Sequence, residues 1–372
     1  MGDSTSIEWT RGDDGQAGAT WNPVRGCSVV SPGCEHCYAM GVAARFSDAG
    51  QPYEGLAKFS SKRRLPQWTG KVRLVPEHLA DPLRWTKPRR IFANSMSDLF
   101  HEELSNEAIA AVFGVMAAAP QHTFQVLTKR ARRMREWFDW ISREKGARQL
   151  GLVLYHAQLL CEHRVLRKTQ PILSQPWPLP NVWLGVSTED QHHAYERIPE
   201  LLRTPAAVRF VSYEPALGPI DFASFLPPKL GTCGHEATTR CRHSLANSDA
   251  AVDWIIIGGE SGPHARPFDV AWASSVVKQC ADAGVACFVK QMGRVVMGDD
   301  DGFEVDAWYF GEGRWWRPGI IGEHNRGRPT KRRGFESDAI GFTLFDKKGG
   351  DMTEWPKSLR VREFPRLERA PS

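Results

Sequence analysis

Short apolar runs that end in polar residues alternate along this chain with longer segments whose apolar residues recur every three or four positions. A short apolar run bounded by turn residues is typical of a buried β-strand, and the longer spacing is typical of an amphipathic helix. The pattern predicts strands near Ala19–Asn22 and at Arg90–Ala93, Thr123–Leu127, Val182–Val186, Val208–Ser212, Trp254–Ile257 and Val285–Val289.

Helical segments follow most of these strands. The first is predicted to begin near Ser105, a good N-cap residue, and to end before Pro120. Two more are predicted around Trp137 and up to about Arg203. A last helix is predicted to end at Gly284, because glycine readily adopts the left-handed conformation that closes a helix.

About seven strand–helix units in succession predict a parallel sheet covered by helices. Polar residues follow nearly every strand, as they do at the active face of a β/α barrel. We therefore expect an α/β fold, a partial or complete TIM-like barrel of about 6–8 parallel strands. A doubly wound open sheet is the alternative, and it would gather its polar tips at one switch point.

The predicted barrel occupies residues 1–295 and carries two insertions, at about 142–180 and 222–250. The C-terminal extension, residues 296–372, is rich in glycine, tryptophan and charge and shows no clear periodicity. We expect it to pack on the barrel as irregular structure.

The composition narrows the class of protein. The chain has 372 residues, of which 41% are hydrophobic, so it can bury a sizeable core. It has no apolar run long enough to span a membrane and no apolar secretory segment near Met1, so we expect a cytoplasmic protein with no membrane partner. Its eight cysteines are then expected to be metal ligands or buried thiols.

The most informative feature is a loop with three cysteines, Cys27, Cys34 and Cys37, punctuated by proline and glycine. Soft thiolates that converge on one point suit an iron–sulfur cluster or zinc. Zinc would need a fourth ligand from elsewhere, such as His101, because structural zinc is four-coordinate. On a [4Fe–4S] cluster, three thiolates leave one iron open, which favours an enzyme.

Several sequence blocks together carry a resemblance. Residues 20–39, which contain the three cysteines, resemble the opening motif of the phage-encoded three-cysteine-motif family, which carries a domain of unknown function and is similar to radical S-adenosylmethionine (SAM) proteins. Further matching blocks are Ile7–Thr10, Asn94–Phe100, Leu127–Arg130, Trp183–Ser187, Glu214–Pro215, Asp253–Gly262 and Phe288–Gly293.

The resemblance implies a [4Fe–4S] enzyme of radical-SAM-like type in a phage or bacterial cytoplasm. Such an enzyme cleaves SAM reductively, takes electrons from an external donor and abstracts hydrogen from a substrate. The common radical-SAM spacing puts three residues between the first two cysteines, whereas six separate Cys27 from Cys34 here. This departure bears on the use of SAM more than on the cluster.

Residues at the predicted strand ends are the candidates for binding SAM. One of Asn94, Ser95 and Asp98 is expected to bind its amino group, and Ser187 and Glu189 are expected to reach the ribose hydroxyls. The alternative is that these residues cap the helices that follow them.

Charged residues at other strand ends are candidates for catalysis and substrate binding. Glu214, Glu260 and Lys290 end apolar strands, where we expect catalytic roles. Lys129 and Arg130 are expected to hold phosphates at the barrel mouth, so the substrate is expected to be a nucleic acid or a nucleotide. The net charge of +5 is too modest to decide this alone.

The second insertion holds two Cys-x-His units that supply a possible zinc site, formed by Cys233, His235, Cys241 and His243. The alternative is a loop with unused ligands. A zinc site here would fit a second function for the whole chain, that of a non-catalytic, metal-stabilised protein that binds nucleic acid.

Overall fold

A computed structural model describes most of the chain. The described residues are 4–12, 15–61, 65–144, 147–161, 175–227, 250–262, 264–298, 309–311, 314–316, 340–343, 348–352 and 355–365. They form two compact units, one of Met1–Ser187 with Glu196–Phe210 and one of Thr188–Tyr195 with Val211–Ser372.

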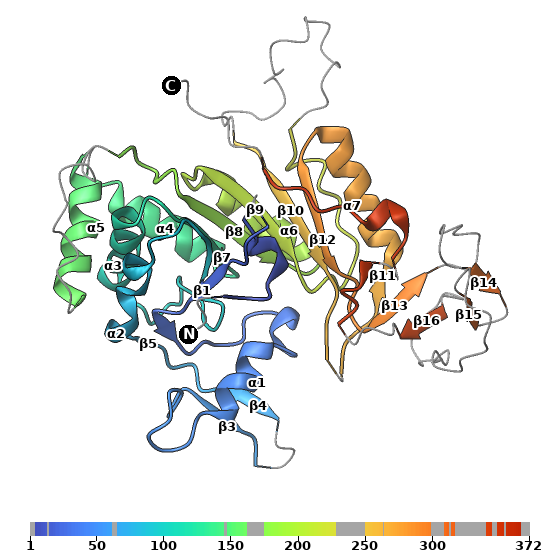
Figure 1. Ribbon diagram of the computed structural model, residues 1–372, viewed down its shortest axis with the longest axis horizontal. Helices are drawn as coiled ribbons and strands as arrows, with labels where there is room; N and C mark the ends of the chain where they lie inside the picture. The colour runs from blue at the N-terminus through green and yellow to red at the C-terminus, as the bar shows by residue number, and fades with distance from the viewer. Residues whose placement is uncertain are drawn as a thin grey trace, which may run out of the picture. The chain divides into compact units, whose positions relative to one another are not determined.

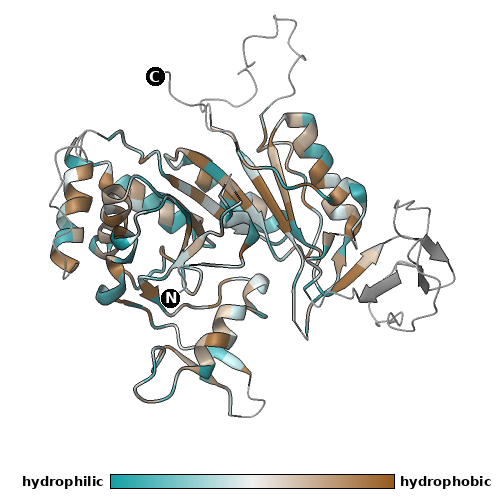
Figure 2. Ribbon diagram, viewed as in Figure 1, coloured by the Kyte–Doolittle hydropathy of each residue, from teal (hydrophilic) through white to brown (hydrophobic). Residues whose placement is uncertain are grey.

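A seven-stranded sheet contains every strand that the sequence pattern predicts. It consists of β1 (Ala19–Trp21), β6 (Arg90–Ala93), β7 (Thr123–Thr128), β8 (Val182–Thr188), β9 (Val208–Tyr213), β10 (Trp254–Gly258) and β12 (Ala286–Gln291). Figure 1 labels these strands, and Figure 2 shows hydrophobic colour along most of them. Several of the strands are buried at every residue, as expected for a sheet covered on both faces.

The order of the strands identifies the type of sheet. Neighbours in the sheet follow one another in the chain, β1-β6-β7-β8-β9-β10-β12, and the pairs β1–β6, β6–β7, β7–β8 and β10–β12 are parallel. This order has no switch point, which excludes the doubly wound alternative. β1 and β12 are the two edges, so the mixed α/β fold is consistent with a partial TIM-like barrel.

Helices alternate with the strands in the first unit, and those that follow β6 and β7 were predicted from the sequence. They are α1 (Tyr38–Arg45), α2 (Pro76–Leu79), α3 (Asn106–Ala118), α4 (Ala131–Ile141) and α5 (Ala147–Leu160). The predicted N-cap of α3 is confirmed, since the Ser105 hydroxyl accepts from the Ala108 amide at 3.2 Å. Two short antiparallel pairs accompany them: β2 (Val24–Arg25) with β5 (Arg73–Leu74), and β3 (Ala57–Phe59) with β4 (Pro66–Trp68).

One face of the sheet in this unit is covered by Trp9, which is 2% exposed. Its ring centroid lies 4.7 Å from that of Phe92 and 6.1 Å from that of Phe210, and its carbonyl oxygen accepts from the Gln125 side chain at 3.2 Å. The register places Phe92, Gln125 and Trp183 side by side on this face. Alternation along the strands puts Asn94, two residues past Phe92, on the same face as Lys129 and Ser187, which lie four residues past Gln125 and Trp183.

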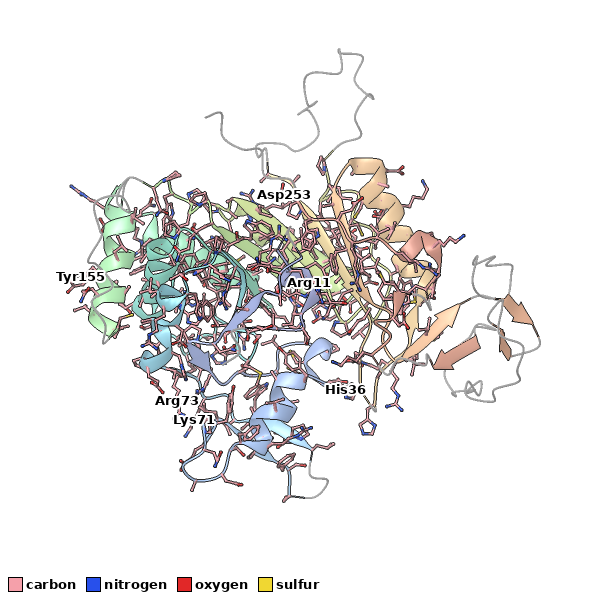
Figure 3. All side chains as sticks on the ribbon, in the orientation of Figure 1. Arg11, His36, Lys71, Arg73, Tyr155 and Asp253 are labelled. Atoms are coloured by element: carbon pink, nitrogen blue, oxygen red, sulfur yellow. The ribbon has the colours of Figure 1, made fainter. Side chains whose placement is uncertain are left out.

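The first insertion contributes α5, which packs closely on α3. Gly114 of α3 touches the α5 backbone so closely that a Cβ there would lie 2.1 Å from the Val153 carbonyl oxygen. Tyr155, on another face of α5, points outward (Figure 3) and is 57% exposed. The insertion therefore adds a layer to the helices instead of forming a loose loop.

In the second unit, α7 (Val270–Ala283) ends as predicted at Gly284, which has a left-handed φ of 68°. α6 (Gln191–Arg203) precedes β9, and the segment that includes its first turn, Thr188–Tyr195, belongs to this unit. In the described residues we find no helix that is both long enough and apolar enough to cross a membrane.

The C-terminal extension differs from the expectation of irregular structure. β13 (Val295–Gly298) pairs with β11 (Phe268–Asp269) and β16 (Ile340–Thr343), and β14 (Tyr309–Gly311) forms a hairpin with β15 (Arg314–Trp316). These strands are too short and too scattered in sequence to produce a visible period.

The last described segment lies along the edge strand β12. The Val289 amide donates to the Val361 carbonyl at 2.8 Å, and the Glu363 amide donates to the Cys287 carbonyl at 2.8 Å. Trp355 is fully buried beside this pairing. The segment thus satisfies backbone groups that an uncovered edge strand would present to solvent.

The contact between α3 and α5 can be tested with two glycines. Gly114→Ala should lower the free energy of unfolding by about 1–3 kcal/mol, because the new methyl group meets backbone that cannot yield. Gly151→Ala, in α5 with open space around it, should raise that free energy by about 0.5–1 kcal/mol. Urea denaturation of both variants measures this, and equal effects would contradict the packing.

Candidate functional site

The carboxyl ends of β1 and β6 are joined by hydrogen bonds from one side chain. The side-chain oxygen (Oδ1) of Asn22, just past β1, accepts from the Met96 amide at 3.0 Å and from the Ser95 hydroxyl at 3.2 Å. The Tyr38 hydroxyl donates to the Ser95 carbonyl at 2.5 Å. The loop after β6 is therefore held against the start of the cysteine loop.

Arg130, two residues past β7, forms hydrogen bonds to both of these loops. Its side chain is 4% exposed. Its Nε donates to Glu102, one Nη donates to Asp98 at 3.1 Å and to the Cys27 sulfur at 3.8 Å, and the other Nη donates to the Ser28 carbonyl at 3.3 Å and hydroxyl at 2.6 Å. All five N–H groups are occupied, so none is left for the phosphate that the sequence led us to expect here.

Asp98 is saturated in the same way. One carboxylate oxygen accepts from the Phe100 amide at 3.0 Å and the Thr128 hydroxyl at 2.7 Å, and the other accepts from the Lys129 amide at 3.1 Å and from Arg130. A carboxylate offers about four acceptor positions. Asp98 therefore orders the strand ends and has no capacity left for the amino group of SAM.

The three cysteines are each half-buried. Burial, then the charge of Asp98, raises the pKa of the Cys27 thiol to about 12, although Arg130 opposes this. Burial also raises the pKa of Cys37, and the Cys34 thiolate adds to it. Cys37 likewise raises the pKa of Cys27. Cys37 is thus near enough to both Cys27 and Cys34 for its sulfur to interact electrostatically with theirs.

Ser28 and His101 form a pair that the sequence did not reveal. His101 is 3% exposed, and its Nε2 lies 2.9 Å from the Ser28 hydroxyl oxygen. The Glu103 amide donates to Nδ1 at 3.2 Å, so Nε2 carries the proton and donates to Ser28. Burial and Arg130 lower the pKa of His101, which keeps it neutral. It therefore cannot take a proton from Ser28 and activate it as a nucleophile.

Lys129 and Ser187 are also in contact, as expected for residues on the same face of neighbouring strands. The Lys129 ammonium donates to the Ser187 hydroxyl. Its positive charge lowers the pKa of Cys37, against the larger effect of burial. Ser187 and Lys129 are therefore candidates for contact with whatever the cysteines hold.

Asn94 is the least satisfied of the predicted ligand residues. It is 3% exposed, its φ is 61°, and neither polar atom of its side chain has a hydrogen-bond partner in the described part of the chain. Ser95 is engaged through both its hydroxyl and its carbonyl oxygen.

The second unit brings two of the three predicted catalytic residues together. The Lys290 ammonium lies 3.0 Å from Glu214, whose other carboxylate oxygen accepts from the Ser212 hydroxyl at 3.1 Å. Gly258 leaves room for this carboxylate, since a Cβ there would lie 2.2 Å from it.

The remaining carboxylates of this unit have other partners. Glu260 is 8% exposed and accepts from the amide and the Nε of Arg266 at 2.9 and 3.0 Å. Glu189 is fully buried, 3.5 Å from Nδ1 of His193. Glu260 is thus bonded to Arg266, whereas Glu214 is paired with Lys290.

The possible zinc ligands Cys233, His235, Cys241 and His243 lie outside the described residues. Among the residues that are described, no group of three or more His, Cys, Asp or Glu side chains is arranged to hold a metal ion. The thiols of Cys27, Cys34 and Cys37 would therefore have to turn toward one another to share a ligand. His36, between Cys34 and Cys37, lies beside the start of α1 (Figure 3).

Fold and strand-end residues define an α/β protein with a partial barrel and a cysteine loop at the carboxyl end of its first strand. Residues 4–339 match the family described as Protein of unknown function (DUF5131), and the chain belongs to this family. The match covers the resemblance blocks but names no activity, phage origin or radical-SAM kinship. No curated protein and no solved structure matches the chain.

The role of Arg130 can be tested by stability. Arg130→Met should lower the free energy of unfolding by about 3–5 kcal/mol, because it leaves the buried Asp98 carboxylate without its counter-charge. Arg132→Met is the matched control, since that side chain is 82% exposed and its ion pair with Glu136, at 3.0 Å, lies on the surface; its effect should stay within about 0.5 kcal/mol. If urea denaturation shows comparable losses of stability for the two variants, the buried Arg130–Asp98 pair does not stabilise the protein as proposed.

Proposed function

We propose that this protein is an iron–sulfur enzyme of radical-SAM-like type, in which Cys27, Cys34 and Cys37 hold a [4Fe–4S] cluster. The observation that carries the proposal is three thiols on one loop at the carboxyl end of a barrel strand, with Cys37 close enough to interact electrostatically with both Cys27 and Cys34. Active sites of β/α barrels lie at this end of the strands.

The chemistry of the donors fits a cluster better than zinc. All three are sulfurs, and the histidine expected as a fourth zinc ligand, His101, is committed through Nδ1 to the Glu103 amide and through Nε2 to Ser28. A zinc ion would therefore have to break these bonds to take His101 as its fourth ligand. A [4Fe–4S] cluster needs only the three thiolates from the protein if its fourth iron binds a ligand.

The charges around the loop support thiolate ligands. Without a metal, burial keeps the Cys27 and Cys37 thiols protonated. Arg130, 3.8 Å from Cys27, and Lys129, near Cys37, would offset the negative charge of the thiolates once a cluster binds. Hydrogen bonds to the sulfurs and nearby charge are also what tunes the potential of such a cluster.

When bound, a [4Fe–4S] cluster supplies one electron at low potential, which is what reductive cleavage of SAM requires. This chain's part is to hold the sulfurs, to fix the loop through Arg130 and to present Lys129, Ser187 and Asn94 from one sheet face to a ligand. An external reductant is the partner that the reaction requires. In the second unit, the Glu214–Lys290 pair is by itself a candidate to hold or move a proton.

Metal content tests the proposal. Protein purified without oxygen should contain iron and acid-labile sulfide, about four of each per chain. Cys27→Ala, Cys34→Ala and Cys37→Ala should each remove most of both, whereas Cys161→Ala, which changes a buried thiol elsewhere, should not. Stoichiometric zinc that survives the three loop variants would instead favour a zinc-stabilised protein that binds nucleic acid.

Cluster uptake should also depend on pH. The pKa values of Cys27 and Cys37 are raised, so both thiols are protonated in the metal-free protein and must release protons to bind iron. Reconstitution should therefore become faster and more complete as the pH rises from about 6.5 to 8.5. Arg130→Lys, which keeps a positive charge near Cys27, should retain this trend, and an extent of uptake that does not change with pH would contradict it.

A further inference from the structure

Two arginines lie opposite each other on the strands that lead into the cysteine loop. Arg25 of β2 and Arg73 of β5 are direct partners in the antiparallel pair that these strands form. Both donate to the Pro52 carbonyl oxygen, Arg25 at 3.4 Å and Arg73 at 2.7 Å. Like charges directly opposite on paired strands repel each other, so an anion that binds both would stabilise this arrangement.

The protein itself does not neutralise these two charges. Neither guanidinium forms an ion pair with a carboxylate within the residues that the structure describes. Glu54, two residues past Pro52, uses its carboxylate to accept from the Gly50 amide at 2.8 Å. A guanidinium has five N–H groups, and the shared carbonyl satisfies one on each arginine, so both have donors and charge available to an external anion.

Positive charge is concentrated in the segment that follows the cysteine loop. Residues 38–74 contain seven basic and two acidic residues, a net charge of +5. The whole chain also has a net charge of +5, so the remaining residues sum to zero. Three of the seven, Lys62, Arg63 and Arg64, lie outside the described residues and are not part of the surface defined below. A local excess of this kind attracts polyanions even when the net charge is modest.

The two arginines lie on an open surface. Arg73 and Lys71 are exposed and lie at the same edge of the structure (Figure 3), and Arg25 is half-buried. The Arg25 guanidinium lies 5.7 Å from the centroid of the Tyr53 ring. The Tyr53 amide donates to the Phe46 carbonyl at 2.9 Å, and the Phe46 side chain is 49% exposed. An exposed aromatic side chain therefore accompanies the cations.

We propose that this basic surface, formed by Arg25, Lys71 and Arg73 with Phe46 beside them, binds single-stranded nucleic acid. Guanidinium groups match the oxygens of a phosphate in geometry and charge. Cations that follow the backbone and an aromatic side chain on which a base stacks are the combination by which proteins hold single strands. An acidic peptide would satisfy the charges alone.

The basic surface adjoins the cysteine loop. Arg25 comes two residues before Cys27, and Gly26 between them packs so closely that a Cβ there would lie 2.2 Å from the Lys71 carbonyl oxygen. A strand bound here would lie beside the cysteines. As a substrate-binding surface it rests on the proposed function, whereas the binding itself does not require a cluster. The assignment moves phosphate binding from Arg130, whose donors are occupied, to exposed residues.

Fluorescence anisotropy with a labelled oligothymidine of about 20 nucleotides tests the binding and its salt dependence. Contacts from three cations to phosphates predict a slope of about −2 for log affinity against log salt concentration, because each contact on a single strand contributes about −0.7. Raising the salt from about 50 to about 200 mM should then weaken binding about 20-fold. No binding at about 100 μM protein in the lower salt, or a slope near zero, would overturn the proposal.

Paired arginine variants locate the binding surface. Arg25→Met combined with Arg73→Met should weaken binding at least about fivefold and reduce the slope to about −0.7. Arg84→Met combined with Arg132→Met is the matched control, because it removes two exposed arginines of the same unit that already have carboxylate partners; it should change the affinity less than about twofold. Equal losses in the two double variants would mean that net charge alone is responsible, and the proposed surface would be wrong.

A charge-preserving variant separates binding from folding. Arg25→Lys combined with Arg73→Lys keeps both positive charges, so it should restore a slope of about −2. If this variant binds as poorly as the methionine variant, the arginines act through the structure of the loop and not through phosphate contacts.

The aromatic contact has its own test. Phe46→Ala should weaken oligothymidine binding about tenfold without changing the salt slope, because it removes base stacking and no charge. Tyr155→Ala, which removes a 57% exposed aromatic side chain from α5, should leave binding unchanged. Polyglutamate carries charge without bases and should compete at least about tenfold less well than unlabelled oligothymidine. Equal competition, or unchanged affinity in Phe46→Ala, would contradict the assignment to nucleic acid.

The basic surface and the cluster can fail independently. The Cys27→Ala, Cys34→Ala, Cys37→Ala triple variant should bind oligothymidine as the unaltered protein does. The double methionine variant of Arg25 and Arg73 should in turn retain its iron and sulfide. Loss of oligothymidine binding in the triple variant would show that the cysteine loop, and not the basic surface, holds the strand.

Discussion

The buried ion pair between Arg130 and Asp98 organises the carboxyl end of the first unit. The two groups lie 3.1 Å apart, and their side chains are 4% and 8% exposed. A buried charge is tolerated only when its partner and its hydrogen bonds are complete, and both residues meet that condition. Through this pair, the ends of β6 and β7 are tied to the Cys27–Ser28 turn, so the position of the cysteine loop depends on it.

This arrangement explains why two charged residues that seemed suited to ligands are instead structural. Arg130 uses all five of its donors and Asp98 uses both of its oxygens within the protein. The residues left for chemistry are the ones that this frame positions: the three thiols, Lys129 with Ser187, and Asn94. In the second unit, Glu214 and Lys290 form a separate pair at the ends of β9 and β12.

The strands and the main helices could be predicted because buried parallel strands are continuous apolar runs and their helices have apolar stripes. The barrel-like sheet was predicted for another reason, namely that polar residues follow nearly every strand instead of gathering at one switch point. The strands of the C-terminal extension were missed, since Val295–Gly298 and Ile340–Thr343 are short and pair across a long separation in sequence. A local period cannot signal such a pairing.

The site was predictable in part. Cysteine spacing and polar strand ends indicate where a site lies. They do not indicate which side chains use their hydrogen-bonding groups on one another. Ser28 and Glu102 gave no signal at all, because their roles come from contacts with Arg130, which lies 102 and 28 positions away. Asn94 was identified by its place after a strand, and only its backbone angle and unpaired amide distinguish it from Ser95.

The claim that the three cysteines hold an iron–sulfur cluster with an open iron is tested most directly by electron paramagnetic resonance. Protein purified without oxygen and reduced with dithionite should show the signal of a reduced [4Fe–4S] cluster, and SAM should change the shape of that signal by binding the open iron. A protein that contains zinc and no iron, or a cluster signal that SAM leaves unchanged, would contradict the account.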